Sequence, residues 1–370
     1  MSDNRAISRT LFEKLLDEKG VYYPFYDFVR SHEKELVLCF RGNGNPESIV
    51  IYHNNHIVWE LYGNEDKIGI NFNHARYNEN WDKIKESLFQ WGFDKNGRDE
   101  KALVPNREGS IGMLYCSCTA KKYCTDPTNF VKETYKLVMA MMSVFFAPKQ
   151  KVDFDYFKKS DTKYKKNYAE KRWQQKLFMD LKFCKTGLFA YDLEFSQPKG
   201  AKQSESNEPD ILALRYEKGV PVAIVLVEVK SLASACRPNT NSKSDILSHI
   251  RGMKAYSKSK NISHRRKEVH DVLTYYEELG LYVKDGQVIP DSDNELPVEC
   301  VLIFTSADLV DIGYSIPSSK SAIHYYLNNK KEIDSYVNED GWKCEVICVG
   351  HFEKNRRYES NDYSLPTEWE

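Results

Sequence analysis

Charged side chains stand inside an otherwise apolar part of the sequence. The stretch "EPDILALRYEKGVPVAIVLVEVKS", residues 208 to 231, places Asp210 directly after a proline and ends an apolar run in Glu228 and Lys230. Such groups are costly to bury unless they are paired or bind an ion. Two carboxylates and an ammonium group at one place are typical of a site for a hard divalent cation, because Mg²⁺ prefers oxygen ligands.

The local pattern predicts that these three side chains meet. Side chains alternate between the faces of a strand, so Glu228 and Lys230 project from the same face. A short turn at Lys218-Gly219 makes "DILALRYE" and "VAIVLVEVK" antiparallel neighbours, which brings Asp210 beside the end of the second strand. The alternative is an ordinary buried ion pair of Glu228 with Lys230 or Asp210, which adds little net stability.

A metal held in this way could support hydrolysis of a phosphate ester. The metal would lower the pKa of a bound water and neutralise charge on a phosphoryl oxygen. Lys230 could deprotonate or orient the attacking water if its own pKa is depressed, or stabilise the transition state as a cation if it is not. Both roles for Lys230 are open at this point.

The second half of the chain has an order of elements that would position these groups. Helical and strand-like patterns are expected in the order helix, three strands, helix, strand, helix, strand. The strands are expected at residues 188–196, 210–217, 222–230, 298–306 and 343–350, and the helices at 164–183, 246–253 and 321–337. A further helix is expected at 269–276, which Gly280 would end. The near-continuous apolar strands predict an α/β fold with a sheet covered on both faces.

The string "PD", seventeen further residues and then "EVK", set in this order of elements, resembles the PD-(D/E)XK nuclease superfamily over roughly residues 164 to 350. The resemblance implies a restriction-endonuclease-like core and Mg²⁺-dependent hydrolysis of phosphodiester bonds, with Mn²⁺ as a substitute. It also implies that Asp210 and Glu228 are metal ligands and that Lys230 is the catalytic lysine.

Members of this superfamily often add an acidic residue from the helix before the first strand. Glu170 is the residue we expect in that catalytic role, because it borders the apolar face made by Trp173 and Leu177. An ordinary surface glutamate is the alternative for Glu170. Asp192 and Glu194, which share one face of the first strand, are further candidates.

The helix after the motif departs from the pattern of many relatives. They carry a glutamine with a tyrosine four residues later, whereas here Gly252 precedes Tyr256. Endonuclease rather than exonuclease activity is therefore expected. His249 lies two helical turns before Tyr256 and could approach the site, although packing or exposure explains it equally well.

Basic residues flank the motif although the net charge of the chain is only −1. Residues 149 to 176 contain ten Lys or Arg against four acids, and residues 251 to 267 contain seven and no acid. Solvated helix faces are the ordinary explanation, and phosphate binding is the functional one. The residues that we expect to bind nucleic acid are Lys165, Lys166, Arg172, Arg251, Lys254, Arg265 and Arg266.

The first half of the chain reads as a separate α+β domain. Strand-like segments at residues 35–42, 48–63 and 67–74, with Asn54-Asn55 at a hairpin turn, predict an antiparallel meander. Helices are expected around Trp81–Trp91 and Phe130–Phe146. A lysine-rich region after Pro148 marks the boundary, so we expect a recognition or regulatory domain at 1–150 and a nuclease-like domain at 151–370.

These patterns predict a DNA endonuclease, set by analogy in restriction or antiviral defence. The alternatives are a non-catalytic nucleic-acid-binding or assembly protein on the same fold, and an RNase. A homodimer or a partner subunit of a defence system is expected, without a membrane. Nine scattered cysteines and a charged start of the sequence favour a cytoplasmic protein.

Overall fold

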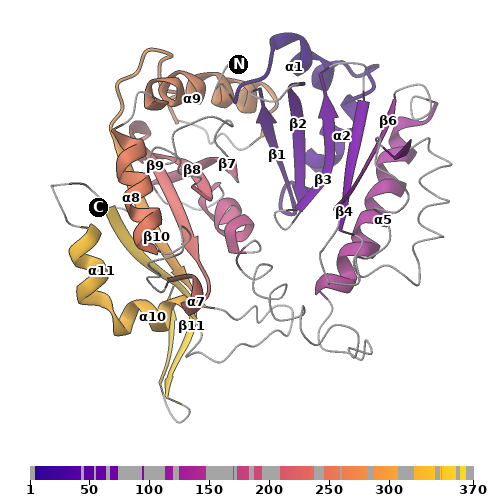
Figure 1. Cartoon of the computed structure of the whole chain (residues 1–370). Coiled ribbons are helices and arrows are strands. Elements are labelled where there is room, and N and C mark those ends of the chain that lie inside the picture. Colours follow the sequence, from indigo (N-terminus) through magenta and orange to yellow (C-terminus); the bar gives the residue numbers. More distant parts are fainter. Residues whose placement is uncertain are drawn as a thin grey trace. The chain divides into compact units, whose positions relative to one another are not determined.

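The computed structural model is a mixed α/β structure with two sheets, and it separates into two compact units, residues 1–150 and 151–370 (Figure 1). Each unit is described by itself. The residues that the structure describes are 5–42, 46–53, 56–63, 67–73, 94–95, 113–119, 125–146, 170, 173–182, 187–193, 209–236, 246–258, 261–281, 287–306, 321–337, 342, 344–355 and 359–363.

An antiparallel sheet forms the centre of the first unit, in the strand order β1-β2-β3-β4-β6-β5. The expected meander is confirmed by its first four strands, and β5 and β6 extend it beyond the prediction. The strands are β1 (Leu36–Arg41), β2 (Ser48–His53), β3 (His56–Tyr62), β4 (Lys67–Asn73), β5 (Asp94–Lys95) and β6 (Met113–Thr119). The predicted helix at 81–91 and the Asn54-Asn55 turn lie outside the described residues.

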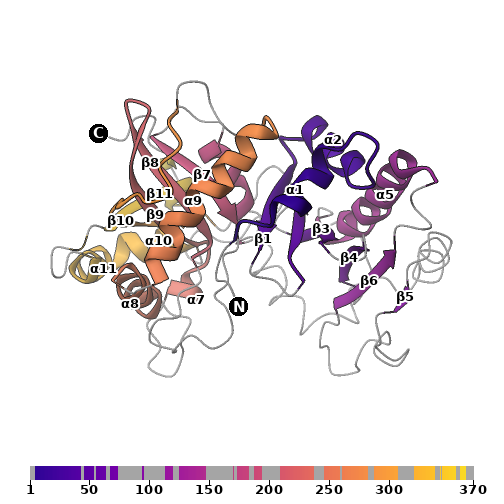
Figure 2. The same cartoon turned by 90° about the horizontal axis from the view of Figure 1, so that it is seen from above.

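Three helices cover one face of this sheet: α1 (Arg9–Leu16), α2 (Tyr23–Ser31) and α5 (Pro127–Phe146) (Figure 2). The helix expected at 130–146 is confirmed as α5. Trp59 of β3 is fully buried between these helices, since its ring meets Phe25 edge-on at 5.4 Å and its Nε1 donates to Thr134 Oγ1 at 3.1 Å. Aromatic packing around one tryptophan thus gives this unit a core of its own.

The second unit is built on a mixed sheet in the order β12-β11-β10-β9-β8-β7. Its first strands, β7 (Leu188–Leu193), β8 (Ile211–Glu217) and β9 (Val220–Lys230), pair antiparallel. The next strands, β10 (Val298–Thr305) and β11 (Cys344–Asn355), run parallel to β9, and β12 (Glu359–Tyr363) returns antiparallel at the edge. β12 was not predicted.

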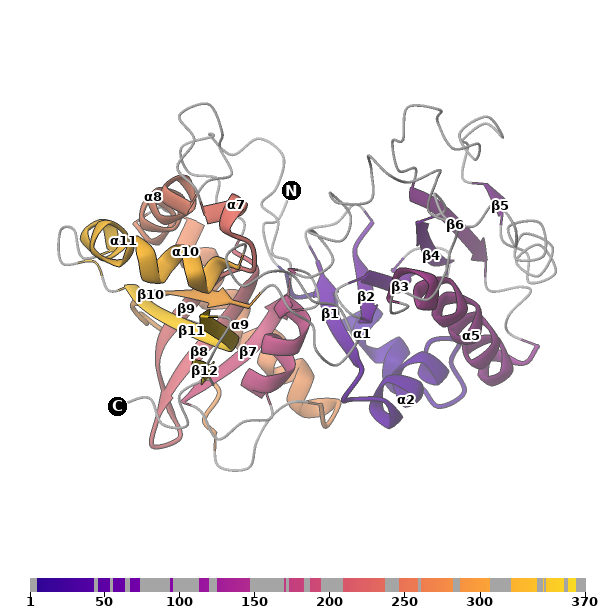
Figure 3. The ribbon, with the colours of Figure 1, turned by 90° about the horizontal axis from the view of Figure 1, so that it is seen from below.

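Helices cover both faces of this sheet. On one face lie α7 (Ala233–Cys236), α8 (Ile246–Ser257), α10 (Ala322–Asn328) and α11 (Lys330–Val337) (Figure 3). The helical segment 173–182 and α9 (Asn261–Glu278) lie on the other, near β7. The expected α/β arrangement is therefore present.

One predicted element has to be corrected. The helix expected over residues 321–337 is interrupted, because α10 ends at Asn328 and Asn329 caps it with its N–H directed to the carbonyls of Tyr325 and Tyr326. α11 then starts at Lys330. Gly280 does end α9 as expected, with a positive φ of 62° and its N–H bonded to Glu277 O.

Candidate functional site

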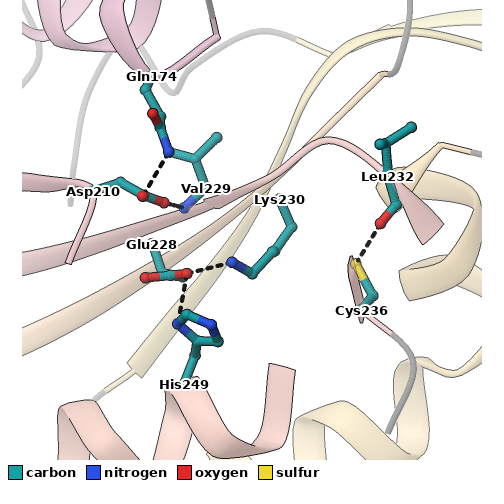
Figure 4. Close-up of polar contacts among 8 residues, drawn as sticks. All are labelled: Gln174, Asp210, Glu228, Val229, Lys230, Leu232, Cys236 and His249. Atoms are coloured by element: carbon teal, nitrogen blue, oxygen red, sulfur yellow. Dashed lines mark hydrogen bonds and ion pairs between the residues drawn. The ribbon is translucent and has the colours of Figure 1, made fainter. Parts of the chain in front are cut away.

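The hairpin of β8 and β9 brings the start of one strand beside the end of the other. Ile211 lies opposite Val227 in the register, and the turn residues Lys218 and Gly219 both have positive φ, 51° and 83°. This backbone geometry is the one that a two-residue hairpin turn requires. Asp210, which precedes β8, consequently accepts a hydrogen bond from the backbone N–H of Val229 at 2.7 Å (Figure 4).

A second donor holds the carboxylate of Asp210. Gln174 Nε2 donates to Asp210 Oδ1 at 2.6 Å, so each carboxylate oxygen accepts one hydrogen bond (Figure 4). Gln174 belongs to the helical segment 173–182 and is only 5% exposed. It was not predicted, although its position four residues after Glu170 was a signal, because that spacing puts two side chains on one helix face.

Glu228 lies fully inside the protein beside two nitrogen donors. Its Oε1 accepts from Lys230 Nζ and from His249 Nδ1, the latter at 2.8 Å (Figure 4). Its Oε2 is also buried and has no hydrogen-bond partner in the described part of the chain. The ion pair of Glu228 with Lys230, which was the structural alternative, is therefore present, but it engages only one of the two oxygens.

The third carboxylate of the site is that of Glu170. This residue is partly exposed as a whole, yet its carboxylate end is enclosed by protein and accepts a hydrogen bond from the backbone N–H of Ser231. The charge of Lys230 lowers the pKa of this carboxyl group, and the charge of Glu228 raises it. Of the other acidic candidates, Asp192 accepts a hydrogen bond at its Oδ1 from the backbone N–H of Leu193, with an N to O distance of 2.9 Å. Glu194 lies outside the described residues.

The charges of this site are unbalanced. Burial raises the pKa of Asp210 well above its ordinary value, and the negative charge of Glu228 adds to the effect. Burial likewise raises the pKa of Glu170, against the attraction of Lys230. Three carboxylates thus share one ammonium group and one imidazole.

Glu228 and Lys230 respond to each other in opposite directions. Burial by itself would raise the pKa of Glu228, but the charges of Lys230 and His249 and their hydrogen bonds lower it to about 2. Burial would lower the pKa of Lys230, but the surrounding carboxylates, first that of Glu228, raise it above its ordinary range. Both groups are therefore charged at neutral pH.

The donor set is suited to a hard cation. The carboxylates of Asp210 and Glu228 lie at one end of the sheet, and Oε2 of Glu228 is buried without a donor among the described residues. Mg²⁺ is usually held by one or two carboxylates together with waters and substrate oxygens. No cluster of three or more His, Cys, Asp or Glu already arranged for a metal occurs among the described residues.

Helix α8 contributes His249 to the site. Tyr256, two turns further on, is instead buried in the core, where it contributes to raising the pKa of Arg265. Cys236 of α7 also lies near, with its Sγ directed to Leu232 O at 3.4 Å (Figure 4). Burial raises the pKa of this thiol to about 12, so Cys236 is a neutral thiol and not a nucleophile.

The predicted phosphate-binding residues have different surroundings. Arg251 is exposed on α8, and Lys254 of the same helix is half-buried. Arg266 is half-buried and pairs with Glu295 at 2.7 Å. Lys165, Lys166 and Arg172 lie outside the described residues.

Arg265 has to be removed from this set. Only 2% of the residue is exposed, and its guanidinium is paired with both carboxylate oxygens of the fully buried Glu268. A buried ion pair of this kind is a structural contact and cannot reach a nucleic acid.

The chain has no match among family models, curated proteins or solved structures. In the described part of the chain, no helix combines the length and the apolar character that crossing a membrane would require.

Proposed function

We propose that this protein is a metal-dependent nuclease of the PD-(D/E)XK superfamily, with a restriction-endonuclease-like core in residues 151–370. The observation that carries the proposal is the excess of buried negative charge at the end of β9. Asp210, Glu228 and Glu170 surround Lys230, and burial raises the pKa of two of these three carboxylates. A divalent cation is the ligand that would relieve this excess.

Asp210 and Glu228 are the proposed metal ligands, and Glu170 is a further carboxylate at the same place. A bound Mg²⁺ or Mn²⁺ would supply an activated water and neutralise charge on the phosphoryl oxygen. The hydrogen bonds from Gln174 and from the Val229 N–H hold the carboxylate of Asp210 in one orientation. A fixed ligand of this kind costs less reorganisation when a cation binds.

Lys230 acts in this proposal as a positive charge and not as a base. The neighbouring carboxylates raise its pKa, so the amine carries its proton at neutral pH. A charged lysine stabilises the negative charge that develops on a phosphoryl oxygen, whereas it cannot accept a proton from water. Of the two roles that the sequence left open, the electrostatic one is supported.

The proposed substrate is DNA, in a reaction of the endonuclease type within restriction or antiviral defence. Arg251 is exposed on α8, the helix that also carries His249, so it offers a phosphate contact. The first unit, residues 1–150, would provide recognition or regulation.

The test is a cleavage assay with plasmid, single-stranded DNA and RNA, in Mg²⁺, in Mn²⁺ and in chelator. We expect metal-dependent cleavage by the wild-type chain and a loss of at least about 10²-fold with Lys230→Ala, because the charge opposite the transition state is gone. Asp210→Asn should lose cleavage as well. Lys218→Ala, at the exposed turn of the same hairpin, is the matched control and should cleave like the wild type.

Two results would contradict the proposal. Equal cleavage by the wild type and Lys230→Ala would indicate a contaminating enzyme. Cleavage that persists in chelator would exclude the metal-dependent reaction. Because Lys230→Ala leaves Glu228 buried with one donor fewer, the folding of each variant is checked by its melting temperature before activity is compared.

A further inference from the structure

The two oxygens of Glu228 have different surroundings. Oε1 accepts from both Lys230 Nζ and His249 Nδ1, while Oε2 accepts from no donor in the described residues although it is buried. A buried carboxylate oxygen without a partner is costly, and such an atom calls for an explanation. The asymmetry would be explained if Oε2 is the oxygen that binds the cation.

His249 is the group that fixes which oxygen of Glu228 accepts the hydrogen bonds. Lys230 alone has a flexible side chain, and its ammonium could serve either oxygen of the carboxylate. His249 approaches from α8, whose neighbouring residues Ile246, Ile250 and Met253 are buried and fix the helix against the sheet. A second donor from this rigid element directs Oε1 toward α8 and leaves Oε2 turned away from it.

The contact also defines the state of the imidazole. A charged carboxylate only accepts hydrogen bonds, so Nδ1 of His249 must carry the hydrogen in this contact. Glu228 also forms an ion pair with the ammonium group of Lys230, as a carboxylate does. In the neutral ring, the hydrogen on Nδ1 leaves Nε2 without one.

We infer that His249 is a positioning residue, which through its Nδ1–H holds Glu228 so that Oε2 faces the metal. The inference rests on the proposed function, because it assigns an orienting partner to one of the proposed metal ligands. Loss of an outer-shell partner of a metal ligand typically weakens metal affinity by about 10–100-fold.

The test compares three substitutions of His249 by direct Mn²⁺ binding to the full chain, followed by electron paramagnetic resonance of free Mn²⁺. An asparagine amide can reach the position of Nδ1, whereas a glutamine amide reaches that of Nε2. We expect His249→Ala and His249→Gln to weaken Mn²⁺ binding by about 10–100-fold, and His249→Asn to restore most of the affinity.

Cleavage assays supply a second readout that a packing role would not change. With His249→Ala, the lost rate should return when the Mg²⁺ concentration is raised, because the defect lies in metal affinity. With Lys230→Ala, additional Mg²⁺ should not restore the rate. A loss with His249→Ala that persists at saturating Mg²⁺ would overturn the positioning role.

The outcomes separate this inference from the proposed function. Wild-type affinity for Mn²⁺ in His249→Ala would refute the inference alone. Equal losses in His249→Asn and His249→Ala would also refute it, since the amide donor would then be of no use. A wild-type chain that neither binds Mn²⁺ nor cleaves nucleic acid would instead refute the proposed function. Melting in chelator shows whether each variant is folded.

Discussion

At the scale of single residues, the site is arranged at the expense of stability. Asp210 is held by Gln174 and the Val229 N–H, yet burial and the charge of Glu228 raise its pKa. An acid whose pKa is higher in the folded than in the unfolded chain weakens the fold as the pH rises through that interval. Glu228 has the opposite sign, because its pKa falls from 4.5 to about 2 and its charge stabilises the fold above that range.

This difference predicts that Asp210→Asn is more stable than the wild type when chelator is present. The asparagine keeps an acceptor for the Val229 N–H, and Gln174 can turn its amide to meet the new NH₂ group. The melting temperature at pH 7 should rise by about 2–4 °C for each kcal/mol gained. Glu217→Gln, at the exposed end of the same strand, is the control and should leave the melting temperature unchanged.

Added Mg²⁺ should reverse the order of the two proteins. The wild type should gain stability from a ligand that binds only the folded state, and Asp210→Asn should gain little. A lower melting temperature for Asp210→Asn in chelator would show that the hydrogen bonds of Asp210 outweigh its buried charge.

At the scale of elements, β11 changes partners at a glycine. The strand runs parallel to β10 up to Val349 and pairs antiparallel with β12 from Gly350 onward. Gly350 has a φ of +119°, and a Cβ at this position would lie 2.4 Å from Ser306 Oγ. Both the backbone conformation and the close approach therefore require glycine.

Two substitutions should separate the cost of the positive φ from the cost of the close approach to Ser306. Gly280→Ala, at the end of α9, meets a positive φ of 62° but nothing within 4 Å, so it should cost about 1–2 kcal/mol in the free energy of unfolding. Gly350→Ala should cost more, because the clash with Ser306 is added to a strain of about 1–3 kcal/mol. Denaturant unfolding of the full chain measures both, and equal costs would mean that Ser306 gives way freely.

At the scale of the whole molecule, two compact units have separate cores, and only the second contains the proposed site. The overall charge of −1 gives no general attraction for nucleic acid, so binding must come from local groups of basic residues. Arg251 is exposed, whereas Arg265 is buried in an ion pair with Glu268. Exposure therefore decides which members of a basic stretch can contact phosphates.

The affinity of the inactive Lys230→Ala chain for DNA should accordingly fall steeply as the salt concentration rises. Arg251→Ala in this background should lower the affinity and reduce the slope of log K against log salt by about 1, which corresponds to one lost phosphate contact. Lys218→Ala in the same background is the control at a remote turn. Fluorescence anisotropy with a labelled DNA duplex provides the measurement, and an unchanged slope for Arg251→Ala would exclude that contact.

Local patterns in the sequence determined most of the elements and the central part of the site. Alternation along residues 222–230 predicted that Glu228 and Lys230 share a face, and the two-residue turn predicted that Asp210 lies beside them. These features were readable because side-chain direction in a strand and the register of a tight hairpin depend on neighbouring residues alone.

Only the tertiary structure decided the partners of these groups. That His249 and Gln174 reach the carboxylates, that Arg265 is buried against Glu268, and that β12 adds an edge all depend on how distant elements pack. A basic stretch looks the same in the sequence whether its members face water or the core. Burial and long-range hydrogen bonds are properties of the assembled sheet and its helices, because they arise between segments that no local pattern connects.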